Sequence, residues 1–325
     1  MTILIVAPNW LGDVMMALPA IRDIRRHFAN DRVAVAARPS VAPVFRAVPG
    51  VDRVVLTEKK TDAADLRGDI GILFPNSFRS AWMLRRSGVK ERWGYPTGFR
   101  RFLLTKAVPR PRRKVSFPEY YSTLVRRLGI DTGPLTAGLE LPAATVGAAR
   151  DLLERHGWTG DRPLVGIAPG TAFGHAKRWL PNRFGELSRM LTERSGARCV
   201  LVGRREDRDA VAGFDAIDLV GQTDLTMLMG VLSLCSAVAA NDSGALHLAA
   251  ALGVPVVGIY GPTDERYSRP ISPPDRAARV VAISEQVFCR PCFLADCPID
   301  HRCMTRISTE RVYDALGRFL LEGHP

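Results

Sequence analysis

A short polar turn in the second half of the chain carries the residue types that bind a phosphate. Residues 235–240 form an apolar run typical of a buried strand, and residues 246–252 are typical of a helix. A helix that begins directly after a strand has unpaired N–H groups at its start, which attract an anion together with the helix dipole. His247 lies near the first helical turn and adds a second donor. The alternative is an ordinary helix cap, because Asp and Ser are common N-cap residues and Gly serves tight turns. The turn residues are Asp242, Ser243 and Gly244.

Asp13 follows the first apolar run of the chain, residues 3–7, and stands near the start of the first expected helix. The residues between the run and Asp13 lack the GxGxxG pattern, which gives dinucleotide binding little support. A carboxylate at this strand end is able to accept a proton from a substrate hydroxyl. A helix N-cap is the alternative interpretation.

Two further loops follow apolar runs of the second half. Thr171 and Lys177 lie in the loop 169–179 and would hold a phosphate through one hydroxyl and one point charge. Because this loop is expected at the same sheet edge as Asp242, the two would converge on one anion; an exposed loop lysine is the alternative. Glu206 follows the next run and would bind ribose hydroxyls, or would simply be favoured by the helix dipole in a first turn.

Four of the six cysteines lie close together near the C-terminus, with His301 beside the last. Such density is typical of a zinc or iron–sulfur loop. The spacing is tighter than in a usual zinc ribbon, so metal binding is the less favoured interpretation. The four are Cys289, Cys292, Cys297 and Cys303.

The candidate site residues lie in a chain of alternating strand-like and helix-like segments. In the first half, strands are expected at 3–7, 33–37, 53–56 and 70–74, and helices at 14–28, 41–48 and 80–86. In the second half, strands are expected at 164–168, 198–202, 237–240 and 256–260, and helices at 183–194, 208–214 and 246–252. This alternation predicts an α/β fold with two Rossmann-like domains and mainly parallel sheets facing across a cleft. The domains are expected at 1–155 and 156–325, with the final helix packing back on the first domain. Ligands of such sheets bind beyond the carboxyl ends of the strands, where all the candidate motifs fall.

Composition narrows the class of partner. The chain has 325 residues, 46% of them hydrophobic, and no apolar run of the roughly 18 residues needed to cross a bilayer. Its N-terminus reads as a first strand without a basic leader, so we expect a cytoplasmic protein. The formal charge of +12 suits an anionic partner, but no nucleic-acid module or stacking stripe is evident. Basic residues gather at 100–101 and 110–114, either as a solvated loop or as a surface for lipid headgroups.

Together these motifs resemble glycosyltransferase family 9, the ADP-heptose:lipopolysaccharide heptosyltransferases, and are closest to its heptosyltransferase II branch. The order and spacing of the motifs over almost the whole chain are more specific than any one of them. They are the segments 8–19, 75–81, 92–95, 176–179 and 241–244, and Cys289-x2-Cys292-Phe293 with Cys297-Pro298.

The resemblance implies a GT-B fold and an inverting transfer of heptose from ADP-heptose to the heptosyl-Kdo2-lipid A inner core. It implies that Asp13 is the catalytic base, and that no cofactor is required. It further implies an anionic lipid-linked core acceptor and peripheral contact with the cytoplasmic face of the inner membrane, for a chain expected to be a monomer. The donor-binding residues would be Thr171, Lys177, Glu206, Asp242, Ser243, Gly244 and His247. The acceptor-binding residues would be Asn9, Arg79, Arg110, Arg112 and Arg113.

Three alternatives remain open. In the first, the chain is another family 9 heptosyltransferase that acts at a different core position. In the second, it is a nucleotide-sugar 2-epimerase on the same fold. The third is a non-catalytic protein that binds phosphate or lipid headgroups; intact Asp13 and Lys177 speak against it.

Overall fold

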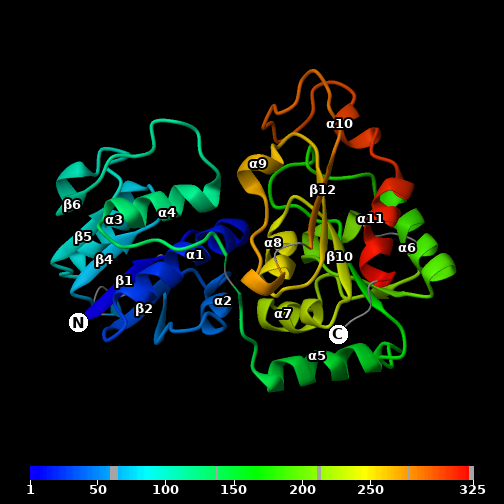
Figure 1. Ribbon diagram of the computed structural model, residues 1–325, viewed down its shortest axis with the longest axis horizontal. Coiled ribbons are helices and arrows are strands. Elements are labelled where there is room, and N and C mark those ends of the chain that lie inside the picture. Colours follow the sequence, from blue (N-terminus) through cyan, green and yellow to red (C-terminus); the bar gives the residue numbers. More distant parts are fainter. Residues whose placement is uncertain (59–64, 137, 211–213, 277–278, 322–325) are drawn as a thin grey trace. The chain divides into compact units, whose positions relative to one another are not determined.

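The computed structural model describes residues 1–58, 65–136, 138–210, 214–276 and 279–321. The chain forms two compact units, Met1–Glu140 and Leu141–Pro325 (Figure 1). Each unit contains one parallel six-stranded sheet with helices packed on it.

In the first unit the sheet order is β3-β2-β1-β4-β5-β6. The central strands are apolar and almost wholly buried, as expected for a parallel sheet that is covered on both faces. Leu4 of β1 pairs with Ala34 of β2 on one side and with Gly71 of β4 on the other. Helix α1 packs against α4. The strands are β1 (Thr2–Val6), β2 (Arg32–Ala37), β3 (Arg53–Leu56), β4 (Ile70–Leu73), β5 (Glu91–Gly94) and β6 (Lys106–Ala107), and the helices are α1 (Leu11–His27), α2 (Ala42–Arg46), α3 (Phe78–Arg86), the 3-10 turn η2 (Arg101–Leu103) and α4 (Phe117–Arg127).

In the second unit the sheet order is β12-β11-β10-β7-β8-β9. Strands β7, β10 and β11 are buried along their whole length and form the centre of the core. The strands are β7 (Leu164–Ala168), β8 (Arg198–Leu201), β9 (Ile217–Asp218), β10 (Ala237–Asn241), β11 (Val256–Tyr260) and β12 (Val280–Ser284). The helices are α5 (Ala143–Arg155), α6 (Pro181–Ser195), η3 (Arg205–Ala210), α7 (Leu225–Ser233), α8 (Gly244–Ala251), α9 (Glu265–Ser268), η4 (Pro274–Arg276), α10 (Arg302–Thr305) and α11 (Thr309–Leu321).

The division between the units falls after Glu140, before helix α5, whereas the sequence places it after residue 155. Helix α5 belongs with the second unit because it packs closely on α7, where Gly230 leaves room for Ala149 and Thr145. The final helix α11 packs against α6, β10 and β11 of its own unit, through buried side chains such as Val312 and Leu316. The packing of this helix on the first domain, which the sequence analysis expects, stays a prediction.

The predicted strands and most predicted helices are present within a few residues of their expected ends. Residues 205–210 form the 3-10 turn η3 in place of the start of an α-helix at 208–214, and residues 211–213 lie outside the described part of the chain. Strands β5, β6, β9 and β12 were not predicted. Strands β6 and β9 are edge strands of two residues each, and β5 (Glu91–Gly94) has only four residues, two of them charged, so none of the three gives a clear apolar run. Strand β12 has an apolar run of ordinary length that the sequence analysis missed. Over the described ranges, no helix combines the length and apolarity that a membrane span requires.

Candidate functional site

The strand order of the second unit reverses between β7 and β10. The chain runs from β7 outward to β8 and β9, and then returns to place β10 on the other side of β7. Loops that follow two such strands diverge and leave room for a ligand at their carboxyl ends. Lys177 lies in the loop after β7, and Asp242 directly follows β10, so both stand at this switch point.

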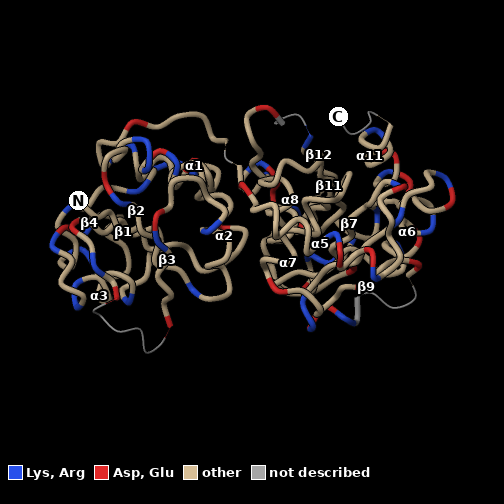
Figure 2. Tube along the Cα trace, turned by 90° about the horizontal axis from the view of Figure 1, so that it is seen from below, with Lys and Arg blue, Asp and Glu red and all other residues tan. Residues whose placement is uncertain are grey.

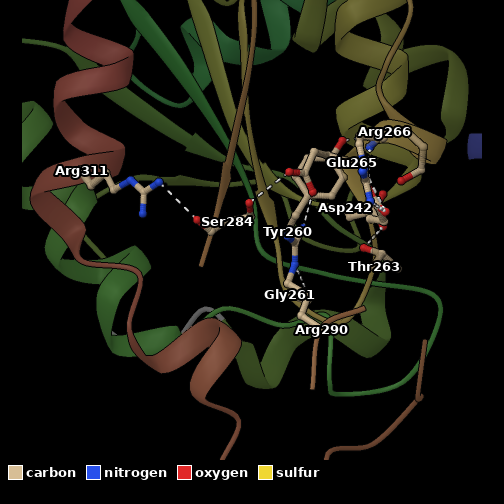
Figure 3. Close-up of polar contacts among 11 residues, drawn as sticks. Asp242, Tyr260, Gly261, Thr263, Glu265, Arg266, Ser284, Arg290 and Arg311 are labelled. Carbon is tan, nitrogen blue, oxygen red and sulfur yellow. Dashed lines mark hydrogen bonds and ion pairs between the residues drawn. The ribbon is translucent and has the colours of Figure 1, made fainter. Parts of the chain in front are cut away.

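Asp242 and Lys177 form a buried ion pair at the switch point. The Nζ atom of Lys177 lies 2.7 Å from Oδ2 of Asp242, and the two side chains are 18% and 4% exposed. The hydroxyl of Thr263, in the loop after β11, donates to the same carboxylate oxygen over 2.7 Å. Figure 3 shows Thr263 pointing toward Asp242. The carboxylate therefore holds the lysine and joins the loops that follow three neighbouring strands.

The pKa of Asp242 reflects these neighbours. Burial alone raises the pKa of this carboxyl, but His247 and the positive charge of Lys177 outweigh burial and hold it well below its ordinary value. The carboxylate is thus ionised at neutral pH, and it repels an anion. Asp242 positions the ammonium of Lys177, and of the two groups only the ammonium attracts an anion.

The start of helix α8 carries buried polar atoms without a partner. Ser243 occupies the N-cap position, yet its side chain makes no capping hydrogen bond. Its Oγ and the Nδ1 of His247 are buried without a hydrogen-bond partner in the described structure. The Nε2 of His247 lies 3.8 Å from Oδ1 of Asp242. The capping alternative is therefore wrong for the side chains of Asp242 and Ser243, and the first N–H groups of α8, from Gly244 onward, remain for an anion.

Asn241 was not predicted as a site residue, although a polar residue at the end of a buried strand was the available signal. It is fully buried. Its Oδ1 accepts from the backbone N–H of Trp179 over 2.9 Å, and its Nδ2 donates to the carbonyl of Pro169 over 2.7 Å. One side chain of β10 thus ties both ends of the loop that carries Lys177.

Thr171 has a partner within its own loop. Its buried hydroxyl donates to the carbonyl of Gly174 over 2.9 Å. Gly174 adopts a φ of +61°, and a Cβ there would lie 2.0 Å from the carbonyl oxygen of Ala295. The hydroxyl hydrogen of Thr171 therefore shapes the loop, and the phosphate contact expected for Thr171 stays a prediction.

The loop that carries four of the six cysteines, residues 289–303, contacts the loop after β7 and the loop after β11. The backbone N–H of Ala176 donates to the carbonyl of Ala295, and His301 Nε2 lies 2.7 Å from the carbonyl oxygen of Ala176. Arg290 donates to the carbonyl of Gly261 and forms an ion pair with Glu265, as Figure 3 shows. The loop thus supports the segments that carry Lys177 and Thr263.

All six cysteines are free thiols. Burial, and then the proximity of Cys297, Cys289 and Cys292, raises the pKa of the Cys303 thiol to about 11. Across the described ranges, no group of three or more His, Cys, Asp or Glu side chains is placed to hold a metal ion. The sequence expectation that no cofactor is required stays a prediction.

Glu206 is exposed in η3, whereas its neighbour Asp207 is buried. Asp207 accepts from the backbone N–H of Arg204 over 3.0 Å and lies 3.6 Å from the guanidinium of Arg178. It also fills the space beside Gly170, where a Cβ would lie 2.3 Å from its carboxyl carbon. Asp207 therefore orders the loops after β7 and β8, and the ribose contact of Glu206 stays a prediction.

In the first unit the strand order reverses between β1 and β4, and Asp13 follows β1. The N-cap position of α1 is held by Trp10, and Asp13 lies inside the first helical turn. The N-cap alternative for Asp13 is therefore wrong. Tyr121 of α4 is close enough that, after burial itself, the charge of Asp13 is the largest cause that raises the pKa of its phenol. Asp13 is partly buried at the switch point of its sheet, where a carboxylate base would stand.

The basic residues of the first unit divide into two kinds. Arg100 is fully buried and donates to the carbonyls of Tyr95 and Ser77 over 2.9 and 3.1 Å; burial lowers the pKa of its guanidinium to about 10. The interpretation of Arg100 as part of a surface cluster is therefore wrong. The acceptor candidates Asn9, Arg79, Arg110, Arg112 and Arg113 are exposed.

Comparison with known proteins agrees with this arrangement. The family model for glycosyltransferase family 9 (heptosyltransferase) matches residues 65–302. Lipopolysaccharide heptosyltransferase 2 of Escherichia coli (strain K12) is 27% identical, over 99% of each chain. Lipooligosaccharide heptosyltransferase 2 of Haemophilus ducreyi is 28% identical, over 84% of this chain and 86% of the relative. The solved structure of E. coli ADP-heptose lps heptosyltransferase II superposes with a TM-score of 0.83 at 26% identity and 99% coverage of each chain, which identifies the two Rossmann-like units as a GT-B fold. Because the family match spans well over half of its length, the chain belongs to glycosyltransferase family 9.

Proposed function

We propose that the protein transfers L-glycero-D-manno-heptose from ADP-heptose to the heptosyl-Kdo2-lipid A inner core, with inversion, in lipopolysaccharide core biosynthesis. The observation that carries this proposal is the switch point of the second unit. There, the buried Lys177–Asp242 pair stands with the uncapped start of α8, an arrangement that suits a diphosphate. The names of the relatives and of the solved structure support heptose as the transferred sugar.

Lys177 and the N-terminus of α8 would hold the diphosphate of the donor. The ammonium has three N–H donors, of which one reaches Asp242, so the others remain for phosphate oxygens. Ser243 and His247 bring the buried polar atoms Oγ and Nδ1 that lack partners in the described structure. As the bond between the sugar C1 and the phosphate oxygen breaks, these groups stabilise the charge that develops on ADP.

Asp13 would activate the acceptor. Its carboxylate takes the proton of the attacking hydroxyl, whose oxygen bonds to C1 as ADP leaves. An inverting transfer needs this single base and no carboxylate nucleophile. Asn9, Arg79, Arg110, Arg112 and Arg113 would contact the anionic acceptor, and Glu206 and Thr171 would add contacts to the donor.

The cellular setting belongs to the same proposal. An acceptor anchored by lipid A requires peripheral contact with the cytoplasmic face of the inner membrane, and a net charge of +12 favours an anionic surface. We further propose that the protein acts as a monomer and needs no metal ion, because a lysine and a helix N-terminus supply the positive potential at the diphosphate.

The test is transfer by purified protein from ADP-heptose to heptosyl-Kdo2-lipid A, followed by the mass of the product. Wild type is expected to add one heptose, and Asp13→Asn to lose transfer while it still binds ADP with wild-type affinity. Wild-type transfer by Asp13→Asn would exclude this base. ADP release at an equal rate without acceptor would instead favour an epimerase, and transfer only to other truncated cores would assign a different core position.

A further inference from the structure

An exposed aromatic patch lies on the first unit, formed by Phe78, Trp82, Phe99 and Phe102. The rings of Phe78 and Trp82 stack with centroids 6.3 Å apart, and Phe102 lies 6.1 Å from Phe78. Phe78, Trp82 and Phe102 are 42%, 44% and 67% exposed, and Phe99 is 95% exposed. Three exposed rings in contact, with the exposed ring of Phe99 three positions before Phe102 in the chain, form an apolar surface of the kind that marks an interaction site.

The fold holds this patch in place. Phe78 and Trp82 stand one helical turn apart on α3, whose opposite side buries Ala81 and Leu84. The buried Arg100 donates to the carbonyl of Ser77 and to the hydroxyl of Ser80, so it ties the segment that carries Phe99 and Phe102 to the start of α3. The aromatic patch is therefore a fixed surface of two joined segments.

Phe99 is held in an unfavourable conformation. Its φ is +56°, a left-handed value that bulky side chains rarely adopt, and it follows Gly98, which also has a positive φ. Burial of the ring does not offset this strain, because the ring is 95% exposed. Strain without a packing benefit points to a role outside the chain.

Positive charge surrounds the aromatic patch. Residues 75–118 contain 12 of the 45 basic residues and one of the 33 acidic residues, so this segment carries +11 of the formal charge of +12. Arg79 and Arg86 on α3 and Arg101 beside Phe102 are exposed. In Figure 2 the charged residues marked along the trace near α3 are mostly blue, the colour of Lys and Arg.

We infer that the aromatic patch and its exposed arginines dock the protein on an anionic phospholipid bilayer. Aromatic rings favour the interface between headgroups and acyl chains, and arginines beside them are attracted to anionic headgroups. The choice of a bilayer over another anionic partner rests on the proposed function, whose acceptor is anchored in one. The rings enter the interface and the arginines remain at the headgroups.

Vesicle co-sedimentation tests this docking. Wild type is expected to bind vesicles of phosphatidylcholine with about one third phosphatidylglycerol, and to bind pure phosphatidylcholine weakly. The double variant Phe99→Asn/Phe102→Ser should bind about tenfold less, since it removes two inserted rings; Asn tolerates the left-handed backbone. Arg86→Gln and Arg101→Gln should each weaken binding about fivefold.

Matched controls and a second readout separate docking from catalysis. Phe288→Ser changes a ring of the second unit that is 81% exposed, and Arg189→Gln changes an exposed arginine of α6; both should bind like wild type. The double variant should keep the wild-type melting temperature and wild-type transfer to a delipidated, water-soluble core acceptor.

Equal vesicle binding by wild type and the double variant overturns the inference, as does an equal loss of binding in the control variants. A change in oligomeric state on light scattering with unchanged vesicle binding would assign the patch to self-association. Because binding is measured without ADP-heptose, it is independent of whether the protein transfers heptose.

Discussion

Replacement of Lys177 by Met removes the ammonium but keeps most of the apolar stem. The carboxylate of Asp242 then stays buried, 4% exposed, with the Thr263 hydroxyl and His247 as its remaining neighbours. Removal of one partner of a buried ion pair costs about 3–5 kcal/mol. Since Lys177 itself is 18% exposed, we expect the lower end, about 3 kcal/mol, which lowers the melting temperature by roughly 6–12 °C.

The same change should weaken ADP binding for a separate reason. A charge-assisted contact to the diphosphate contributes about 1.5–3 kcal/mol, so the Kd for ADP should rise roughly 10- to 100-fold. The double variant Lys177→Met/Asp242→Asn no longer buries an unpaired charge. It should recover most of the lost stability and none of the lost ADP affinity.

Thermal melting and calorimetric titration with ADP measure these two effects on the same samples. Lys90→Met, a change of the same type at an exposed position of the first unit, is the control and should leave both quantities unchanged. If Lys177→Met melted with wild type and bound ADP with wild-type affinity, both roles of the lysine would be refuted. If the double variant stayed as unstable as the single one, the loss would come from packing of the lysine stem.

Three further outcomes are expected. The pKa of Asp242 is held well below its ordinary value, so its ionised form stabilises the fold above about pH 4, and this stabilisation is lost as the pH falls further. The difference in melting temperature between wild type and Asp242→Asn should therefore narrow below about pH 4. Neutralising Arg110, Arg112 and Arg113 together should raise the acceptor KM and reduce the salt dependence of transfer without changing the donor KM, since exposed charges are screened beyond about 8 Å at physiological salt; a parallel rise in both KM values would indicate damage to the fold. Purified protein should contain no stoichiometric metal, and a chelator should leave its melting temperature unchanged; about one zinc ion or an iron–sulfur chromophore per chain would contradict this.

The strand–turn–helix at β10 and α8 could be predicted from sequence, because an apolar run, a polar turn and a helical pattern are local signals. The sequence also predicted that the Lys177 loop and the Asp242 turn meet at one sheet edge. It did not predict that the two side chains, 65 residues apart, bind each other directly, because both were expected to bind the same anion. For Arg100 the sequence prediction was wrong in the other direction, because a residue expected at the surface is buried. Its basic neighbours indicate a surface, and only the tertiary structure reveals the carbonyls that satisfy a buried guanidinium.

If the donor binds as proposed, the Lys177–Asp242 ion pair has a consequence for how the diphosphate is held before and after transfer. A buried lysine without a counter-ion would hold the diphosphate equally tightly before and after transfer, and uniform binding of that kind does not speed the chemical step. With Asp242 ionised beside it, the charge of Lys177 is compensated, and its remaining N–H groups are fixed in direction by a 2.7 Å contact. Fixed donors and the start of α8 then act most strongly when negative charge grows on the leaving phosphate. In the proposed donor site, the carboxylate that repels an anion is thus also the group that compensates the charge of Lys177 and fixes the direction of its remaining N–H groups.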